Sequence, residues 1–358
     1  MIEKSIMWQY IRQEDSILKN IIESDYIDKL LESMGPNWDN IYFVAHGSSY
    51  NASVVVSNYM ARIANLRVYN AIPSNFKYNG TSLLKESKKK TLVIAISQTG
   101  TSRGVLEAVS KAKDAGYSIL GITDADDSPL EKLSDYKMIM GCGNEDSNAK
   151  TKGYSATILN LILFALKLGL KKKVLSMEEY KSEIMELKEQ VNQISYVREK
   201  VEKWCIDNSY GKNMSNIYVI GYGMNFGTAL EGQLKLMETM CIPTMFNDIE
   251  EFSHGMHRSI NENSYIILLN AEHPLKGISL NTFDYLKKKT SHVLLLNASD
   301  HIVNDAKELI LPSFPKTESV LMLTCAIQVI SVFVPELNGQ DPNVDANNDY
   351  TKFVKTRV

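Results

Sequence analysis

The sequence predicts an α/β fold made of two doubly wound, flavodoxin-like lobes, each with a parallel sheet and the two related by an internal repeat. Two observations predict it. Short apolar runs typical of buried strands alternate with helix-length segments along the chain. In addition, the pattern that opens at Asn40 returns at Asn216, and each copy runs from an apolar strand through a glycine-containing turn into a helix. The chain therefore folds as two related halves.

Each half contains the expected elements in the same order. The first half predicts a strand at 41–45 and a helix at about 52–65, then a strand at 92–96, a helix at 104–116 and a strand at 118–122. The second half predicts a strand from 217, a helix at 228–240, and strands at 265–269 and 293–296. Two helices are expected ahead of Gly35-Pro36, at 6–22 and 26–34.

These elements predict five parts of the chain: N-terminal helices (1–35), a phosphate-binding lobe (36–175), a connecting amphipathic helix (176–212), a second lobe (213–337) and a C-terminal tail (338–358). A frayed tail is the default expectation, and only the family resemblance described below implies that the tail folds over the active site. The 358 residues, 44% hydrophobic, suffice for two globular domains. The connecting helix carries mixed charges rather than a basic face, which argues against a membrane-surface helix.

Composition narrows the class of partner. A formal net charge of −3 shows no excess of basic residues of the kind that binds nucleic acid or an anionic membrane. The longest apolar run, 158–166, is too short to span a bilayer, and the charged N-terminus is unlike a signal peptide. The 4 cysteines show no C-x-x-C spacing. We therefore expect a reduced cytoplasmic protein without a disulfide framework or a zinc site.

The strand expected at 92–96 ends in a turn rich in hydroxyl groups, S-Q-T-G-T-S at 97–102. Because a helix is expected to begin just after it, hydroxyl groups, free backbone N–H groups and the positive end of a helix dipole meet there. No Lys closes the turn in a G-x-x-x-x-G-K-[ST] pattern, which argues against a nucleoside triphosphate. The turn predicts a site for one phosphate on a small molecule; an ordinary hydroxyl-rich loop is the alternative.

The equivalent segment of the second half, N-A-E-H-P-L at 270–275, lacks the hydroxyl cluster, and its acid would repel an anion. We expect a single phosphate site per chain. In the second half, the charged residues that could form a site lie instead on its first helix, where Glu231, Lys235 and Glu238 share one face. That helix begins at the carboxyl end of a strand, where ligands of such folds bind. The alternative is an exposed row of ion pairs.

The stretch E-E-F-S-H-G-M-H-R at 250–258 concentrates titratable groups. His254 and His257 lie three residues apart beside two carboxylates, but Gly255 interrupts a rigid helix and the H-E-x-x-H pattern is absent, so we expect no metal. Histidine titrates near physiological pH and can act as an acid or a base. A plain surface loop is the alternative for His257 and Arg258.

Five segments taken in order resemble the sugar isomerase (SIS) domain family: H-G-S-S-Y-N at 46–51, S-Q-T-G-T-S at 97–102, A-L-E-G-Q-L-K-L-M-E at 229–238, E-E-F-S-H-G at 250–255 and F-V-K at 353–355. The pattern is similar to the isomerase half of glucosamine-6-phosphate synthase and to related free-standing ketosamine-phosphate deglycases and phosphosugar isomerases. The resemblance implies a sugar phosphate as ligand, no cofactor, and a homodimer in which the His254 segment lies near the neighbouring subunit's site.

The resemblance also implies roles for individual residues. The side chains that it implies for binding the sugar phosphate are Ser48, Ser49, Ser97, Gln98, Thr99 and Ser102. It implies that Glu238 moves a proton between C1 and C2, and that Lys235 and Glu231 bind the substrate beside it. His254 is implied in ring opening. Lys355 is implied to form a Schiff base with an open-chain ketose, a role that suits an amine nucleophile, although a frayed tail is the default expectation.

Two departures from the family pattern narrow the expected activity. The chain opens Met1-Ile2-Glu3 without a catalytic cysteine, so we expect no glutaminase activity, and the usual K-H-G-P is S-H-G-M at 253–256. We expect an enzyme that acts on an amine-bearing sugar 6-phosphate by C1/C2 proton transfer, as a ketosamine-phosphate deglycase or an amino-sugar-phosphate deaminase or isomerase. An aldose–ketose isomerase and a non-catalytic phosphosugar sensor are the alternatives.

Overall fold

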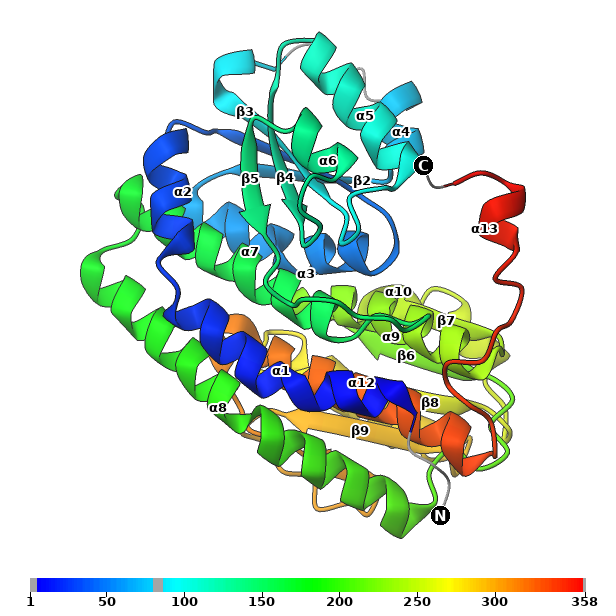
Figure 1. The fold of residues 1–358 in the computed structure, drawn as a ribbon. Helices are drawn as coiled ribbons and strands as arrows, with labels where there is room; N and C mark the ends of the chain where they lie inside the picture. The colour runs from blue at the N-terminus through cyan, green and yellow to red at the C-terminus, as the bar shows by residue number, and fades with distance from the viewer. Residues whose placement is uncertain (1–4, 80–85, 357–358) are drawn as a thin grey trace. The chain divides into compact units, whose positions relative to one another are not determined.

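The computed structural model describes residues 5–79 and 86–356, which form two compact units (Figure 1). Each unit contains one five-stranded sheet whose strand pairs are all parallel. Lobe 1 comprises Ile17–Glu145, Gly153–Ile184 and Asp345–Val358, and lobe 2 comprises Met1–Ser16, Asp146–Lys152 and Met185–Val344. The predicted class, α/β with two doubly wound lobes, is confirmed.

The sheet of lobe 1 has the strand order β2-β1-β3-β4-β5. Its strands are β1 (Asn40–Ala45), β2 (Arg67–Ala71), β3 (Thr91–Ile96), β4 (Ser118–Thr123) and β5 (Tyr136–Ile139). Both β1 and β3 are buried along their whole length, as expected for apolar runs at the centre of a sheet covered on both faces.

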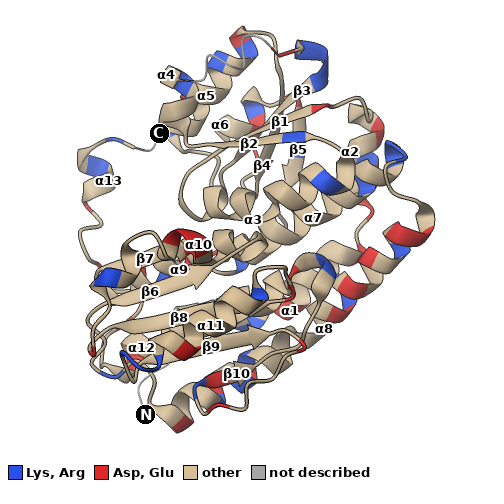
Figure 2. Ribbon diagram, turned by 180° about the vertical axis from the view of Figure 1, so that it is seen from behind, with Lys and Arg blue, Asp and Glu red and all other residues tan. Residues whose placement is uncertain are grey.

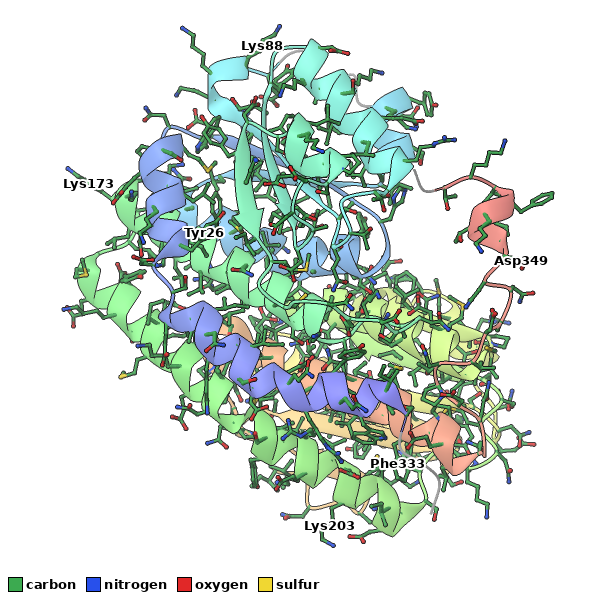
Figure 3. All side chains as sticks on the ribbon, viewed as in Figure 1. Tyr26, Lys88, Lys173, Lys203, Phe333 and Asp349 are labelled. Atoms are coloured by element: carbon green, nitrogen blue, oxygen red, sulfur yellow. The ribbon has the colours of Figure 1, made fainter. Side chains whose placement is uncertain are left out.

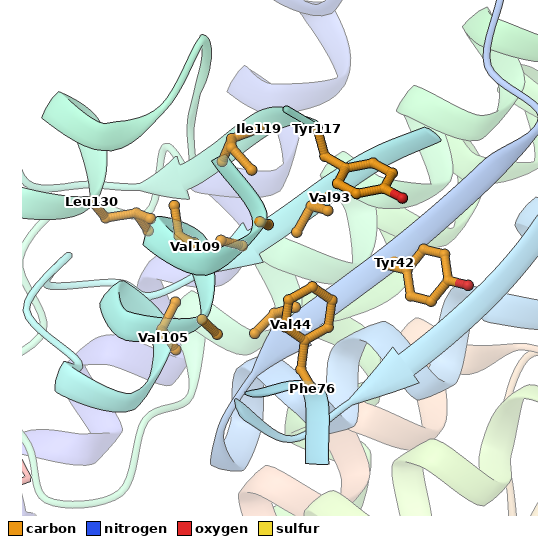
Figure 4. Close-up of a cluster of buried hydrophobic side chains, with 12 residues drawn as sticks. Tyr42, Val44, Phe76, Val93, Val105, Val109, Tyr117, Ile119 and Leu130 are labelled. Carbon is orange, nitrogen blue, oxygen red and sulfur yellow. The ribbon is translucent and has the colours of Figure 1, made fainter. Parts of the chain in front are cut away.

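Helices cover both faces of this sheet. On one face lie α3 (Gly47–Ala64) and α7 (Lys152–Lys171), and on the other lie α4 (Pro73–Asn79), α5 (Arg103–Asp114) and α6 (Pro129–Leu133) (Figure 1). The second face has an apolar core in which Val105 and Val109 of α5 and Phe76 of α4 pack on Val44 and Val93 of the sheet (Figure 4). This packing fixes where α5 begins, and therefore fixes the turn that precedes it.

Lobe 2 repeats the topology. Its sheet has the order β10-β9-β8-β6-β7, so the first strand again lies between the second and the third. The strands are β6 (Ile217–Gly221), β7 (Thr244–Asp248), β8 (Tyr265–Ala271), β9 (Val293–Ala298) and β10 (Glu308–Ile310). The main helices are α9 (Met224–Met240), α10 (Ile249–Phe252), α11 (Lys276–Leu286) and α12 (Val320–Leu337). The internal repeat expected from the sequence is thus a repeat of sheet topology.

The remaining long helices are α1 (Ile6–Glu23), α2 (Tyr26–Met34) and α8 (Met177–Asn208). The division between the two units falls within α1 and α8. In lobe 1 the hydroxyl of Tyr26, labelled in Figure 3, donates to the carbonyl of Lys137, 2.7 Å away. Figure 2 shows acidic and basic residues intermixed along α8. This helix matches the connecting helix expected from the sequence, with a polar face of mixed charge.

Two helices of the described chain, α7 and α12, are long and apolar enough to span a bilayer. The expectation based on the run 158–166 underestimated α7, because the helix extends beyond that run on both sides to reach 20 residues. However, 94% of the apolar window of α7 and 89% of that of α12 is buried within the protein. Both therefore have the burial of core helices.

Candidate functional site

Two turns lie side by side at the carboxyl edge of the lobe 1 sheet. Ala45 at the end of β1 is paired with Ile96 at the end of β3, so the residues that follow these two strands are neighbours. The helix expected from about residue 52 begins at Gly47 instead, because Gly47 has φ 53° and directs the chain straight into the first turn. Ser48 and Ser49 thus lie in the first turn of α3, half-buried.

The turn at 97–102 is closed by its own backbone. The Gly100 N–H donates to the carbonyl of Ser97 over 2.9 Å. The Ser97 N–H donates to the carbonyl of Ile122 in the neighbouring strand β4 over 3.0 Å. Gly100 has φ 64°, and a Cβ there would lie 2.3 Å from Oγ of Ser128. Only glycine fits this position. Ser102 is the N-cap of α5 but makes no side-chain capping bond, and the hydroxyls of Thr99 and Thr101 lie 2.9 Å apart.

The side chain of Gln98 is held by groups that the sequence analysis did not identify. Its Nε2 donates to Sγ of Cys142 over 3.2 Å, and that thiol lies 2.8 Å from Oδ2 of Asp124. Asp124 also accepts backbone N–H bonds from 141, 142 and 143 at 2.6–2.9 Å. On another side, a Cβ at Gly153 would lie 3.0 Å from Oε1 of Gln98. Gln98 is therefore fixed by its surroundings before any ligand arrives.

His46 is a second group that the sequence analysis passed over. It is the N-cap of α3, and its Nδ1 lies 3.2 Å from Oγ of Ser102. Partial burial, together with the positive charge of Lys77, lowers the pKa of His46 below its ordinary value. The sequence H-G-S-S-Y-N could have indicated His46, because this histidine lies two residues before the serines expected to bind phosphate.

The C-terminal tail reaches the same helix end. The carbonyl of Thr356 accepts a hydrogen bond of 3.2 Å from the backbone N–H of Arg103, the first residue of α5. Asp349, labelled in Figure 3, precedes the short helix α13 (Tyr350–Phe353). Lys355 is exposed, with φ 53°. The part of the tail from Asp345 onwards thus belongs to lobe 1, with Lys355 next to the residue that contacts α5.

In lobe 2, α9 carries a buried row of charges. Lys235 is 1% exposed; its Nζ lies 2.5 Å from Oε2 of Glu238 and 3.6 Å from Oε1 of Glu231, which is also 1% exposed. The alternative of an exposed row of ion pairs is wrong for Glu231 and Lys235. The side chain of Glu238 is 33% exposed, so one end of this row reaches solvent.

His254 lies in an exposed turn between α10 and the short helix η3 (Met256–Ser259). Its backbone N–H donates to the backbone carbonyl of Glu251, whereas Nδ1 of His257 lies 3.2 Å from the carbonyl of Phe252. No hydrogen bond or ion pair joins His254 to Glu238 within the described chain. Nor do residues 5–79 and 86–356 contain a group of three or more potential metal ligands.

The helix end of lobe 2 that corresponds to the start of α3 is filled by the protein's own carboxylate. Oε2 of Glu318 accepts from the N–H of Met224, the first residue of α9, over 2.8 Å, and a Cβ at Gly223 would clash with it. At the neighbouring turn, Lys276 pairs with Glu272 at 2.9 Å and with Asp300 at 2.6 Å. Glu272 is therefore neutralised rather than repelling, and 270–271 belong to β8 instead of the turn.

Comparison with known proteins agrees with this architecture. The sequence model of the SIS domain matches residues 36–167 and 212–327. A glutamine–fructose-6-phosphate aminotransferase (isomerizing) of Caldanaerobacter subterraneus subsp. tengcongensis is 24% identical over 99% of this chain and 56% of its own length. The corresponding protein of Clostridium acetobutylicum is 28% identical over 76% of this chain and 42% of its own length. The chain spans about half the length of these curated relatives.

Solved structures give the same result. A candidate phosphosugar isomerase from Clostridium difficile 630 superposes with a TM-score of 0.88 at 28% identity, covering 97% of both chains. The C-terminal domain of glucosamine-fructose-6-phosphate aminotransferase from Francisella tularensis has a TM-score of 0.84 at 20% identity, over 96% of this chain and 99% of that domain. Glucosamine-6-phosphate deaminase from Thermotoga maritima has a TM-score of 0.75 at 18% identity, over 94% and 96%. The last two likenesses concern the fold alone.

Proposed function

We propose, on the premise that the chain belongs to the SIS domain family, that it is an enzyme acting on an amine-bearing sugar 6-phosphate by proton transfer between C1 and C2. The reaction would be deglycation of a ketosamine phosphate, or deamination or isomerisation of an amino-sugar phosphate. No cofactor is required, because a carboxylate suffices to move a proton beside a carbonyl or an imine.

The observation that carries this proposal is the ion pair of Lys235 and Glu238. A buried ammonium holds the Glu238 carboxylate at 2.5 Å while a third of that side chain stays exposed, so the carboxylate has a fixed position and remains accessible to a ligand. A general base requires both properties. We assign Glu238 as the base, and Lys235 and Glu231 as substrate-binding residues. The row would thus position the base against the carbon from which the proton leaves.

The phosphate end of the substrate is assigned to the turns of lobe 1. Hydroxyl groups and the N-termini of α3 and α5 gather there, and such helix ends attract anions. The side chains assigned to the phosphate are Ser48, Ser49, Ser97, Gln98, Thr99 and Ser102. His254 is assigned to ring opening and Lys355 to imine formation with an open-chain ketose.

The names of relatives support a substrate that carries nitrogen. The curated relatives are aminotransferases of fructose 6-phosphate, and one structure of the same fold is a glucosamine-6-phosphate deaminase. Substrates of both kinds carry, or acquire, an amine beside the carbon that exchanges a proton. We therefore place the amine at C1 or C2 of a sugar 6-phosphate. We also propose that the reaction takes place in the cytoplasm.

Release of free amine tests the proposal. Purified protein is incubated separately with glucosamine 6-phosphate and with fructosamine 6-phosphate, and the amine and sugar products are measured. We expect turnover of at least one substrate, and we expect Glu238→Gln to reduce it by at least about a thousandfold, since the base is lost. Glu262→Gln is the matched control, because Glu262 is an exposed carboxylate in the loop before β8 and has no role in the proposed site.

Two results would contradict the assignment. Full activity of Glu238→Gln would exclude that residue as the base. Tight binding of both substrates with no turnover would favour the alternative of a phosphosugar sensor, and conversion of glucose 6-phosphate to fructose 6-phosphate without turnover of either amine would favour an aldose–ketose isomerase.

A further inference from the structure

We propose that His46 is a further ligand-binding residue of the lobe 1 site, which takes up a proton when a phosphate monoester binds and then donates a hydrogen bond to Ser102. The inference rests on the proposed function for the nature of the ligand. It goes beyond that function by assigning the site a positively charged group and a dependence on pH.

The geometry that supports this assignment is the contact of one imidazole with the ends of two helices. His46 is the N-cap of α3, and its Nδ1 lies 3.2 Å from Oγ of Ser102, the N-cap of α5. The ring also packs against the first turn of α5, since a Cβ at Gly104 would lie 2.7 Å from its Cε1. The imidazole is therefore held where the N-termini of two helices meet, and the positive ends of their dipoles attract an anion.

The protonation state of His46 decides what Ser102 offers to a ligand. A neutral imidazole has one donor and one acceptor nitrogen, so its Nδ1 can accept the only hydroxyl hydrogen of Ser102. In the imidazolium form both nitrogens donate. Nδ1 then donates to Oγ of Ser102, whose own hydrogen is released to bind a phosphate oxygen. One proton taken from solvent thus adds a positive charge and frees a hydroxyl donor.

The charged groups around His46 come from α4 and α5. Lys77 of α4 is paired with Glu107 of α5, and Lys111 of α5 donates to the carbonyl of Lys77. Arg103 begins α5. Partial burial and Lys77 lower the pKa of His46, so the ring is neutral at pH 7 before the ligand binds. A bound phosphate dianion raises the pKa of His46, because a nearby negative charge favours the charged form of the ring.

The sign of the pH dependence follows from this difference. Between the pKa of His46 in the free protein and its pKa in the complex with the phosphate monoester, the complex holds more protons than the free protein does. Affinity due to His46 therefore falls as the pH rises through that interval, by linkage. Above the pKa of the complex, His46 stays neutral and contributes no charge.

Calorimetric titration tests the inference. Glucitol 6-phosphate, which has no carbonyl and cannot turn over, is titrated at pH 7 in two buffers of different ionisation enthalpy, which gives the number of protons taken up. We expect His46→Gln to lose that uptake and to bind about tenfold more weakly at pH 6, the size expected for a hydrogen bond to a charged group. The difference should shrink by pH 8.5. The phosphate's own ionisation is common to both proteins and cancels.

Two further variants separate the alternatives. His292→Gln is the control, because His292 also has a lowered pKa but lies at the amino end of β9, stacked on Tyr265 at 4.2 Å, and we expect wild-type uptake. Ser102→Ala should weaken binding yet keep the proton uptake. Equal uptake by wild type and His46→Gln would overturn the inference alone. Failure of the wild type to bind glucitol 6-phosphate, fructose 6-phosphate or inorganic phosphate would overturn the proposed function as well.

Discussion

At the scale of single residues, burial separates the charges of α9 from ordinary surface pairs. Exposed ion pairs contribute little to stability, whereas removing one partner of a buried pair leaves an uncompensated charge in a medium that solvates it poorly. Lys235 and Glu231 are both buried, while Glu238 is partly exposed. The same ammonium therefore has two consequences: it stabilises the fold through Glu231 and fixes the position of Glu238.

Replacing Lys235 by Met should lower the free energy of unfolding by about 3–5 kcal/mol, because the buried carboxylate of Glu231 loses its cation. Urea denaturation of the protein, followed by tryptophan fluorescence, measures the loss. The double variant Lys235→Met/Glu231→Gln is the matched control, and we expect it to regain much of the lost stability. An unchanged denaturation midpoint in the single variant would show that the two charges are not coupled.

Replacing Gly153 by Ala should weaken phosphate binding with little effect on stability. The added methyl would lie 3.0–3.1 Å from the side-chain amide of Gln98, so the amide must shift by a few tenths of an ångström. Since Gly153 lies in the first turn of α7, alanine suits its backbone. Titration with fructose 6-phosphate should show a weaker Kd and an unchanged melting temperature for the free protein. Wild-type affinity would mean that Gln98 does not contact the ligand.

At the scale of elements, the sequence predicts well those strands and helices that are buried or amphipathic over their whole length. The strand expected at 92–96 agrees with β3 within one residue, and the connecting helix expected at 176–212 agrees with α8 within one residue at its start and four at its end. The strands β2, β5, β7 and β10 are not predicted from the sequence, because they are outer strands of the two sheets and depend on pairing with a neighbour for their stability. A short or half-exposed segment gives little periodic signal of its own.

The starts of α3 and α9 were placed four or five residues too late for a related reason. Gly47 and Gly223 have positive φ and make the turn themselves, so α3 begins at Gly47 and α9 begins directly after Gly223. In the sequence, these glycines and the small polar residues after them are typical of a longer loop. The groups around Gln98 could not be predicted, because Asp124, Cys142 and Gly153 are far from it along the chain and meet it only in the folded lobe.

The turn between β3 and α5 should tolerate no side chain at its glycine. Gly100→Ala places a methyl group 2.3 Å from Oγ of Ser128 in a backbone conformation with φ 64°, so we expect a loss of about 1–3 kcal/mol in unfolding free energy. The control is Gly277→Ala in α11, where no atom lies within 4 Å of the new methyl and helix propensity favours alanine by up to about 1 kcal/mol. Equal stability of the two variants would contradict the strained turn.

At the scale of the whole molecule, we propose a homodimer in which the His254 segment serves the neighbouring subunit's site. His254 is exposed, and within the described residues its ring makes no hydrogen bond to its own chain. A symmetric dimer is the commonest assembly of soluble proteins. Sedimentation at equilibrium tests the assembly, but only a functional assay tests the exchange of His254.

Mixing two inactive variants tests the exchange. His254→Asn and Glu238→Gln are unfolded together and refolded as a mixture. If His254 acts on the partner, each mixed dimer has one intact site, and the mixture should recover about a quarter of wild-type activity, since about half of the dimers are mixed. If His254 acts within its own chain, every site lacks one residue and no activity returns.

The central claim is that Glu238 moves a proton at C1 or C2 of a bound sugar phosphate. The most direct measurement is the incorporation of solvent deuterium into fructose 6-phosphate and glucosamine 6-phosphate, followed by proton NMR in D2O. Wild type should exchange the C1 or C2 hydrogen of at least one of them, and Glu238→Gln should bind the same compound without exchange. Binding by wild type with no exchange in either compound, or exchange that persists in Glu238→Gln, would contradict the claim.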